Sequence, residues 1–175
     1  MRNDVAEALA AATDVVNEWL VAQQHAGVTL ALADAQTIKD TVQRFLRGAR
    51  RRKVSHWDWE RKFYKRVRHR DAWIFDLRRG SQPMVLCLGT IAIREDHVIL
   101  EYLERRAYAR VKGVALAAAY QFALAVANVL GLCEVRVNDP INDKLARYYE
   151  RKLEMTPVRH PADGRVKYLY RRIEP

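Results

Sequence analysis

The chain has 175 residues, of which half are hydrophobic and 30% are charged, and its net charge is +10. This length predicts one domain, and this composition is that of an ordinary soluble globular protein. The two cysteines, Cys87 and Cys133, each lie in an apolar strand candidate and are expected to be buried and reduced, as in a cytoplasmic protein. The five histidines are scattered singly, which excludes a clustered metal site, and the acidic N-terminus does not resemble a signal peptide.

The first 70 residues predict three helices and one strand. Apolar residues recur at a helical period from residue 4 to residue 26, and Gly27 would end this helix. A short strand is expected at residues 28–32, after which Asp34 would cap a helix whose inner face is Ile38, Val42, Phe45 and Leu46. Ser55 and Asp58 indicate the start of a third helix, which continues through Trp57, Trp59, Phe63 and Val67.

The remaining residues predict strands around one long helix. Strands are expected at residues 73–77, 84–93 and 98–103, with a turn at residues 80–83. The uncharged stretch from Val114 to Leu132 is about long enough to span a bilayer, but its alanines and the strand that follows favour a helix packed on a sheet. After a strand at residues 133–137, Asp139-Pro140 indicates another helix start. A hairpin at residues 155–160 and 166–173, turning at Asp163-Gly164, ends the chain.

This order of elements predicts the fold class. Strands lie on both sides of a crossover helix, which is typical of an α+β domain with a mixed sheet. We expect residues 1–27 to form an N-terminal helical extension and residues 28–175 to form the main domain.

The positive charge has a definite place in the sequence. Residues 44–70 hold twelve Lys or Arg residues against Asp58 and Glu60, a net charge equal to that of the whole chain. Such a basic block suits an anionic partner, and Trp57, Trp59, Phe63 and Tyr64 among these cations could stack on bases. Two helices with solvated basic faces and aromatic inner faces would explain the same pattern.

Residues 110–115 join the strand at 98–103 to the long helix. A tight turn with a glycine, opening a helix, leaves several backbone N–H groups without partners at the positive end of the helix dipole. Arg110 and Lys112 add charge, and Gly113 lets a ligand approach the backbone. The sequence therefore predicts a pyrophosphate site here, although an ordinary strand-to-helix turn would have similar residues.

The spacing Arg110-x-x-Gly113-x-Ala115 resembles the acyl-CoA pyrophosphate loop of the GNAT acetyltransferase superfamily, and Asn142, Leu145, Ala146 and Tyr149 resemble its second signature. Residues 28–173 also follow the family's order of elements. The resemblance implies a GNAT-like mixed, mostly antiparallel twisted sheet flanked by helices, here with an extra N-terminal helix. It also implies that acetyl-CoA is the co-substrate.

The resemblance implies roles for individual residues. Acetyl-CoA would contact Leu103, Arg105 and Asn142 as well as the loop and helix start, which comprise Arg110, Val111, Lys112, Gly113, Val114 and Ala115. Tyr149 would donate to the departing thiolate, with Tyr148 as the alternative, and Asn142 could instead cap its helix. Glu101 is the candidate base, and Glu104, expected on the opposite face of the strand, competes with it.

The resemblance leaves the acceptor open. The leading hypothesis is an acetyl-CoA-dependent N-acetyltransferase acting on an unidentified amine, with tRNA, another RNA or another anionic macromolecule considered because of the basic block. The alternative is a catalytically inactive GNAT-fold protein that binds nucleic acid or a protein through residues 44–70. A homodimer is left open, and no membrane association is expected.

Overall fold

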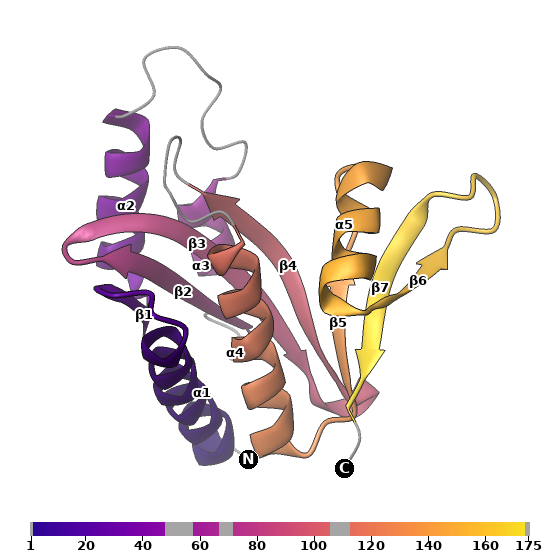
Figure 1. The fold of residues 1–175 in the computed structure, drawn as a ribbon, viewed down its shortest axis with the longest axis horizontal. Coiled ribbons are helices and arrows are strands. Elements are labelled where there is room, and N and C mark those ends of the chain that lie inside the picture. The colour runs from indigo at the N-terminus through magenta and orange to yellow at the C-terminus, as the bar shows by residue number, and fades with distance from the viewer. Residues whose placement is uncertain (1, 48–57, 67–71, 106–112, 174–175) are drawn as a thin grey trace.

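The computed structural model describes residues 2–47, 58–66, 72–105 and 113–173 (Figure 1). The sheet has seven strands in the order β1-β2-β3-β4-β5-β7-β6, antiparallel throughout except for the parallel pair β4–β5. The predicted α+β class and the predicted order of elements are confirmed. The elements are α1 (Arg2–Ala22), β1 (Val28–Leu32), α2 (Ala35–Arg47), α3 (Trp59–Arg66), β2 (Ala72–Arg79), β3 (Gln82–Ala92), the 3-10 helix η2 (Ile93–Glu95), β4 (His97–Arg105), α4 (Val114–Leu130), β5 (Glu134–Asn138), α5 (Asp143–Leu153), β6 (Thr156–Arg159) and β7 (Val166–Arg172).

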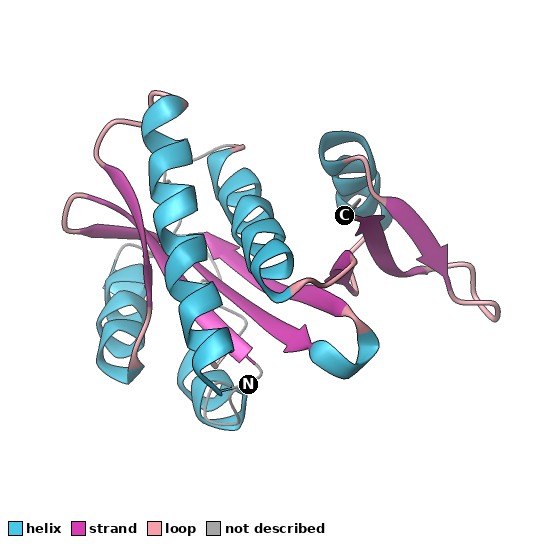
Figure 2. Ribbon diagram, turned by 90° about the horizontal axis from the view of Figure 1, so that it is seen from below, coloured by secondary structure: helices cyan, strands magenta, loops and turns pink. Residues whose placement is uncertain are grey.

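Helices cover both faces of the sheet. Helices α1 and α4 lie side by side on one face, and α5 covers the β5–β7 end of that face, whereas α2 and α3 lie on the other face (Figures 1 and 2). Because side chains alternate along a strand, β2 supplies Trp73 and Phe75 to the larger core under α1 and α4 and Ile74 to the smaller core under α2 and α3.

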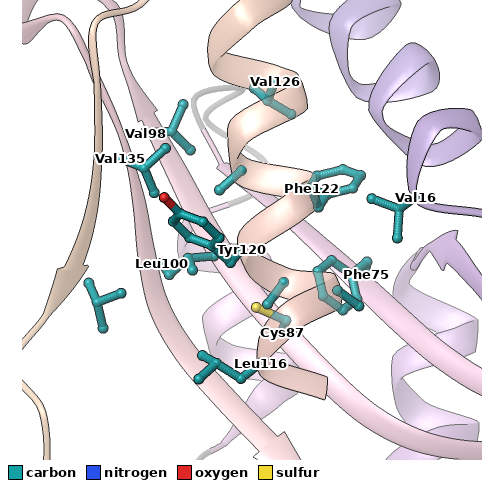
Figure 3. Packing of buried hydrophobic residues seen from close by; sticks show 14 of the residues in the cluster. Val16, Phe75, Cys87, Val98, Leu100, Leu116, Tyr120, Phe122, Val126 and Val135 are labelled. Atoms are coloured by element: carbon teal, nitrogen blue, oxygen red, sulfur yellow. The ribbon is translucent and has the colours of Figure 1, made fainter. Parts of the chain in front are cut away.

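Helix α4 lies at the centre of the larger core. Ten of its 17 residues are buried, which explains why the segment has no charge. Phe122 of α4 packs against Trp73 and Phe75 of β2, with ring centroids 4.6 Å and 5.4 Å away, and Val16 of α1 joins this cluster (Figure 3). Within the described part of the chain, no helix is long and apolar enough to cross a membrane.

Helix α1 shares the core of the main domain. Its inner residues Ala12, Val16 and Leu20 are fully buried in the same cluster as the α4 residues. Asn17 fixes α1 to the first strand, because its side-chain amide donates to the Leu30 carbonyl at 3.0 Å and accepts from the Leu30 N–H at 2.8 Å. The division of the chain at residue 27 therefore stays a prediction.

Several predicted boundaries are wrong by a few residues. Helix α1 ends at Ala22 rather than at residue 26, and strand β3 already includes residues 82 and 83 of the predicted turn. Cys133 is exposed rather than buried, because β5 begins one residue later, whereas Cys87 is buried as expected.

The predicted helix start at Asp139-Pro140 is also wrong. Asp139 has a left-handed backbone, with φ of +40°, and its N–H donates to the Lys167 carbonyl of β7 at 3.0 Å. This bond keeps the chain in register with β7 past the end of β5, so the helix starts four residues later than Asp139. Helix α5 is instead capped by Asn142, whose side chain accepts from the Leu145 N–H at 2.9 Å.

Candidate active site

Strands β4 and β5 separate in the middle of the sheet. They pair in parallel from His97 beside Glu134 to Leu100 beside Val137, and the pairing ends there. Beyond Leu100, β4 continues to Arg105 paired with β3, while β5 and α5 diverge from it (Figure 1). None of the described strands pairs with the second edge of residues 101–105, so this part of β4 forms one side of an opening in the sheet.

A pocket of about 480 Å³ lies in this opening. Its walls come from β4 and β3 on one side, from the first two turns of α4, and from β5, α5 and the loop between them on the other side. The lining combines apolar side chains with polar groups that could orient a ligand. The lining residues are Cys87, Leu100, Glu101, Tyr102, Leu103, Leu116, Ala119, Val137, Asn138, Asp139, Pro140, Ile141, Leu145, Tyr149 and Arg165.

The N-terminus of α4 adjoins this pocket. Gly113 is the N-cap residue with φ of +86°, and no side chain caps the helix. Among the described residues, apart from its neighbour in the chain, no heavy atom lies within 4 Å of the position that a Cβ on Gly113 would occupy, so this side of the backbone is open to a ligand. The first-turn N–H groups have no acceptor within the helix, which leaves them available to an anion.

The structure describes only part of the predicted loop. Val114 is half-buried and Ala115 is buried, so their side chains face the protein while their N–H groups belong to the first helical turn. Arg110, Val111 and Lys112 lie outside the described residues, as does the side chain of Arg105. Leu103 lines the pocket from β4, as expected for a residue that contacts the ligand.

Tyr149 reaches the pocket from the buried face of α5. Its side chain is only 9% exposed, and it lines the pocket together with Cys87 of β3. Burial raises the pKa of Tyr149 to about 12, and Cys87 and Tyr148 act in the same direction. Tyr148 is half-buried, lies with its ring centroid 6.1 Å from that of Tyr149, and is not among the pocket-lining residues described above. This geometry favours Tyr149 over Tyr148.

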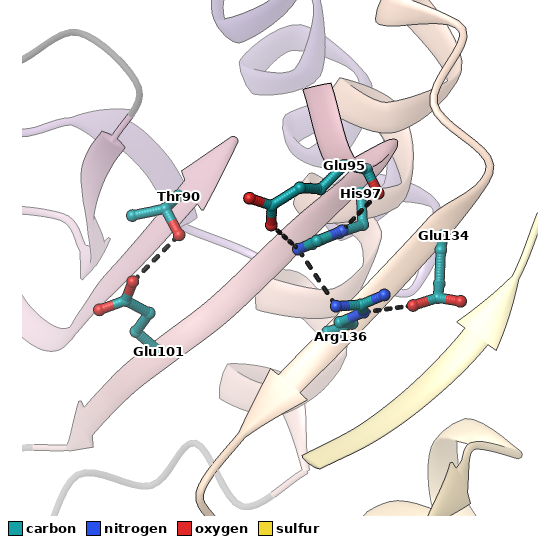
Figure 4. Close-up of polar contacts among 6 residues, drawn as sticks. All are labelled: Thr90, Glu95, His97, Glu101, Glu134 and Arg136. Atoms are coloured by element: carbon teal, nitrogen blue, oxygen red, sulfur yellow. Dashed lines mark hydrogen bonds and ion pairs between the residues drawn. The ribbon is translucent and has the colours of Figure 1, made fainter. Parts of the chain in front are cut away.

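Glu101 lies at an irregularity of the sheet. Leu88 of β3 pairs with Tyr102 but Gly89 pairs with Leu100, so Glu101 is the extra residue of a β-bulge. The hydroxyl of Thr90 donates to the Glu101 carboxylate at 3.0 Å, and Glu101 also lines the pocket (Figure 4). The bulge thus places the Glu101 carboxylate in contact with Thr90 while the residue lines the pocket.

Because of the bulge, Glu104 lies on the same face of β4 as Glu101, not on the opposite face as the sequence predicts. A regular strand would place residues 101 and 104 on opposite faces, but the extra residue shifts the alternation. Glu104 accepts a hydrogen bond from the indole of Trp59 in α3, on the same face as Thr90. Glu104 therefore contacts α3 and is not among the residues that line the pocket.

A second contact joins α3 to this part of β4. The ammonium of Lys62 lies 3.1 Å from the centroid of the Tyr102 ring, a cation–π contact. Asp58 caps this short helix by accepting from the Arg61 N–H at 2.9 Å, whereas the sequence predicts a start at Ser55, which lies outside the described residues. Helix α3 is thus held against the open half of β4.

A polar cluster lies at the other end of the parallel pair. Buried His97 donates from Nδ1 to the Glu95 carbonyl at 2.7 Å and accepts at Nε2 from Arg136 at 3.4 Å (Figure 4). Arg136 also bonds Glu134 and lies 4.9 Å from the Tyr168 ring centroid. This cluster ties β4, β5 and β7 together where the strands are paired. Across the described residues, no group of His, Cys, Asp and Glu could hold a metal ion.

The structure brings together much of the predicted site. One pocket is lined by Glu101, Leu103 and Tyr149. The first turn of α4, which follows Gly113 and contains Ala115, lies beside this pocket. Asn142 instead caps α5. Three further residues lie beside them that the sequence does not identify as site residues, namely Thr90, Tyr102 and Cys87. No local signal marks Thr90 or Tyr102, because their positions depend on strand pairing across the bulge.

Comparison with known proteins supports the fold. No protein-family model matches the sequence, and no curated protein is significantly similar to it. Solved structures do match: an acetyltransferase from Thermus thermophilus is 14% identical, with a TM-score of 0.64 over 83% of this chain and 97% of that one. A probable acetyltransferase of the GNAT family from Chromobacterium violaceum is 13% identical, with a TM-score of 0.61 over 83% and 87%.

A spermidine N-acetyltransferase from Vibrio cholerae is also similar. It is 13% identical, with a TM-score of 0.59 over 83% of this chain and 94% of that one. At these identities the likeness establishes the fold. The chain has the GNAT fold, as its sequence resemblance implies.

Proposed function

We propose that this protein is an acetyl-CoA-dependent N-acetyltransferase. The observation that carries the proposal is the pocket between β4 and β5, which in a GNAT fold brings Glu101 and Tyr149 beside the N-terminus of α4. The acceptor is an amine that remains to be identified.

The residues of the opening suit an acyl-CoA. The open space at Gly113 and the unpaired N–H groups of the first turn of α4 would hold the pyrophosphate. The edge of β4 that no described strand covers would pair with the amides of an extended pantetheine chain, in the way that a strand edge binds a peptide. Leu100, Leu116 and Val137 would pack against its apolar part.

Three groups would then act on the reaction. Glu101, directly or through a water, would accept the proton of the acceptor amine. Backbone N–H groups of residues 103–105 would donate to the carbonyl oxygen as negative charge develops on it. Tyr149 would face the sulfur that leaves with CoA.

The pKa of Tyr149 defines its proposed role. A value of about 12 keeps the phenol protonated at neutral pH. Because an ordinary thiol has a pKa of about 8.5, full proton transfer from this phenol to the thiolate is unfavourable. Tyr149 would therefore stabilise the departing sulfur by donating a hydrogen bond to it, and the proton released from the amine would finally reach the thiol.

Two features point to different acceptor classes. The V. cholerae protein is named for spermidine, a polycation, whereas the basic block at residues 44–70 suits an anionic acceptor such as RNA. About half of the block, residues 48–57 and 67–70, lies outside the described residues. Of the cationic side chains described in it, Arg44 donates to the Ser81 carbonyl at 2.6 Å, Lys62 contacts Tyr102, and Arg61 and Lys65 are exposed.

Calorimetry combined with an acceptor screen would test the proposal. We expect acetyl-CoA and CoA to bind with 1:1 stoichiometry and the melting temperature to rise with either ligand. Release of free CoA in the presence of polyamines, peptides or aminoacyl-RNA would then identify the acceptor class. Absence of CoA binding, together with salt-dependent RNA binding, would instead favour a non-catalytic protein that binds nucleic acid.

A further inference from the structure

Helix α3 is fixed to the strand segment that forms one wall of the pocket. Trp59, which is 1% exposed, donates from its indole to Glu104 of β4. One turn further along the helix, Lys62 extends over the ring of Tyr102. These contacts help to determine where the Lys62 amine lies relative to β4.

The Lys62 amine contacts a residue that lines the pocket. Tyr102 lies under this amine and is one of the lining residues. Glu101, its neighbour in the bulge, lines the same pocket and is held by Thr90 on the face of the sheet that carries α3. Tyr102 thus links the Lys62 amine to the lining of the proposed acyl-donor site, one residue from the candidate base.

We propose that Lys62 is an acetylation site of this protein and that the protein's own pocket acetylates it. This inference rests on the proposed function. The ammonium first gives a proton to Glu101 or to a water beside it. The amine nitrogen then forms a bond to the acetyl carbon as the carbon–sulfur bond breaks. The products are an amide on Lys62 and CoA thiol, which takes up the second proton of the amine.

Holding the amine close is the physical reason for a fast intramolecular transfer. A reactant fixed near its partner avoids the entropic cost of a bimolecular encounter. Acetylation removes the positive charge and with it the cation–π attraction to Tyr102. The modification would therefore weaken a contact that holds α3 against β4, and it would occur once per chain.

Lys65 provides a comparison within the same helix. It is exposed, whereas Lys62 is half-buried, so simple chemical acetylation by acetyl-CoA would favour Lys65. Acetylation by the protein's own pocket would instead favour Lys62 over Lys65.

The test incubates the full-length protein with acetyl-CoA and follows each lysine by peptide mass spectrometry. We expect Lys62 to react at least about tenfold faster than Lys65, because the pocket holds its amine close, with a first-order rate that does not change with protein concentration. Lys62→Arg should keep a cation over Tyr102 but abolish the single acetyl group seen by intact mass, and Lys65→Arg should not. Gly113→Glu, which blocks the proposed donor site, should slow acetylation of Lys62 to the rate at Lys65.

The other outcomes separate the two proposals. Equal rates at the two lysines, or a rate at Lys62 that rises with protein concentration, would overturn the intramolecular transfer. If calorimetry shows that acetyl-CoA binds but Lys62 stays unmodified, the inference fails while the proposed co-substrate stands. If acetyl-CoA does not bind at all, both fail.

Discussion

The two halves of strand β4 differ in their neighbours, although they belong to one continuous strand. From His97 to Leu100 the strand is paired on both sides, with β3 and with β5. From residue 101 to residue 105 it is paired with β3 alone, and the candidate residues lie around this second half. Where both edges are paired, the strand contributes to stability; where one edge is open, its backbone and side chains are available to a ligand. Substitutions in the two halves should therefore have different effects.

The largest effect is expected at the helix start beside the open half. Gly113→Glu would place a carboxylate next to the proposed pyrophosphate site. Two like charges about 4 Å apart repel by about 4 kcal/mol at an effective dielectric constant of about 20, which is about a thousandfold in affinity. Isothermal titration calorimetry with CoA measures this loss.

Gly113→Asn is the matched control for that substitution. Asparagine adds no charge but, like glutamate, places a Cβ on a residue with φ of +86°, so both variants carry the same backbone strain and differ in charge. We expect it to keep most of the affinity. If the glutamate variant binds CoA as tightly as the asparagine variant, the pyrophosphate does not lie at this turn.

The paired half of β4 is tested at Gly89 of β3, which pairs with Leu100. A substitution there should lower the stability of the protein. A Cβ at Gly89 would lie 2.2 Å from the Trp73 ring and 2.7 Å from the Ile99 carbonyl oxygen, and neither can move away easily. We expect Gly89→Val to lower the free energy of unfolding by about 3 kcal/mol, measured by urea denaturation. Gly80→Asn, at an open left-handed turn, is the control and should change it little. A Gly89→Val protein as stable as this control would show that the core adapts more easily than the geometry implies.

A substitution at Tyr149 tests the chemistry proposed beside the open half of β4. Tyr149→Phe keeps the buried ring and removes the hydroxyl, so acetyl transfer to the acceptor found by screening should fall by about a hundredfold, with unchanged CoA affinity. Stopped assays of free CoA thiol measure the rate. Tyr148→Phe serves as the control, and a larger loss in that variant would transfer the role to Tyr148.

The smallest effect is expected at the bulge between the two halves. Thr90→Val removes the hydroxyl that donates to Glu101, and such a bond stabilises the charged carboxylate. Without it, the carboxylate is less firmly positioned to act as a base, so kcat/KM for the acceptor found by screening should fall. One hydrogen bond to a charged group is worth about 1.5 kcal/mol, which corresponds to about a tenfold loss of rate.

Thr90→Ser distinguishes this role from a structural one. Serine keeps the donor, so its kcat/KM should match that of the native protein. A loss in Thr90→Ser as large as that in Thr90→Val would mean that Thr90 supports the bulge and does not act on Glu101.

Local signals are sufficient to predict several elements. The helix predicted in the uncharged stretch from Val114 to Leu132 corresponds to α4, because a run of small apolar residues ends at Gly131, which adopts the left-handed backbone that stops a helix. Asp34 caps the helix that follows it, as predicted, whereas Asp58 caps α3 in place of the helix start predicted at Ser55. The start of α5 is not predicted correctly, because Asp139-Pro140 and Asn142 are equally good local signals. Pairing with Lys167, 28 residues further along the chain, decides between them.

Neighbours in the chain are enough to specify the order of elements, their buried faces, the glycine turn before α4 and the resemblance to GNAT acetyltransferases. Packing of distant segments was needed to reveal the bulge at Glu101, its contact with Thr90, the contact of Glu104 with α3, and the place of Lys62 over Tyr102. These features depend on strand register and on how α3 packs against β4. Since shifting a strand by one residue exchanges its two faces, no periodicity within the strand can specify them.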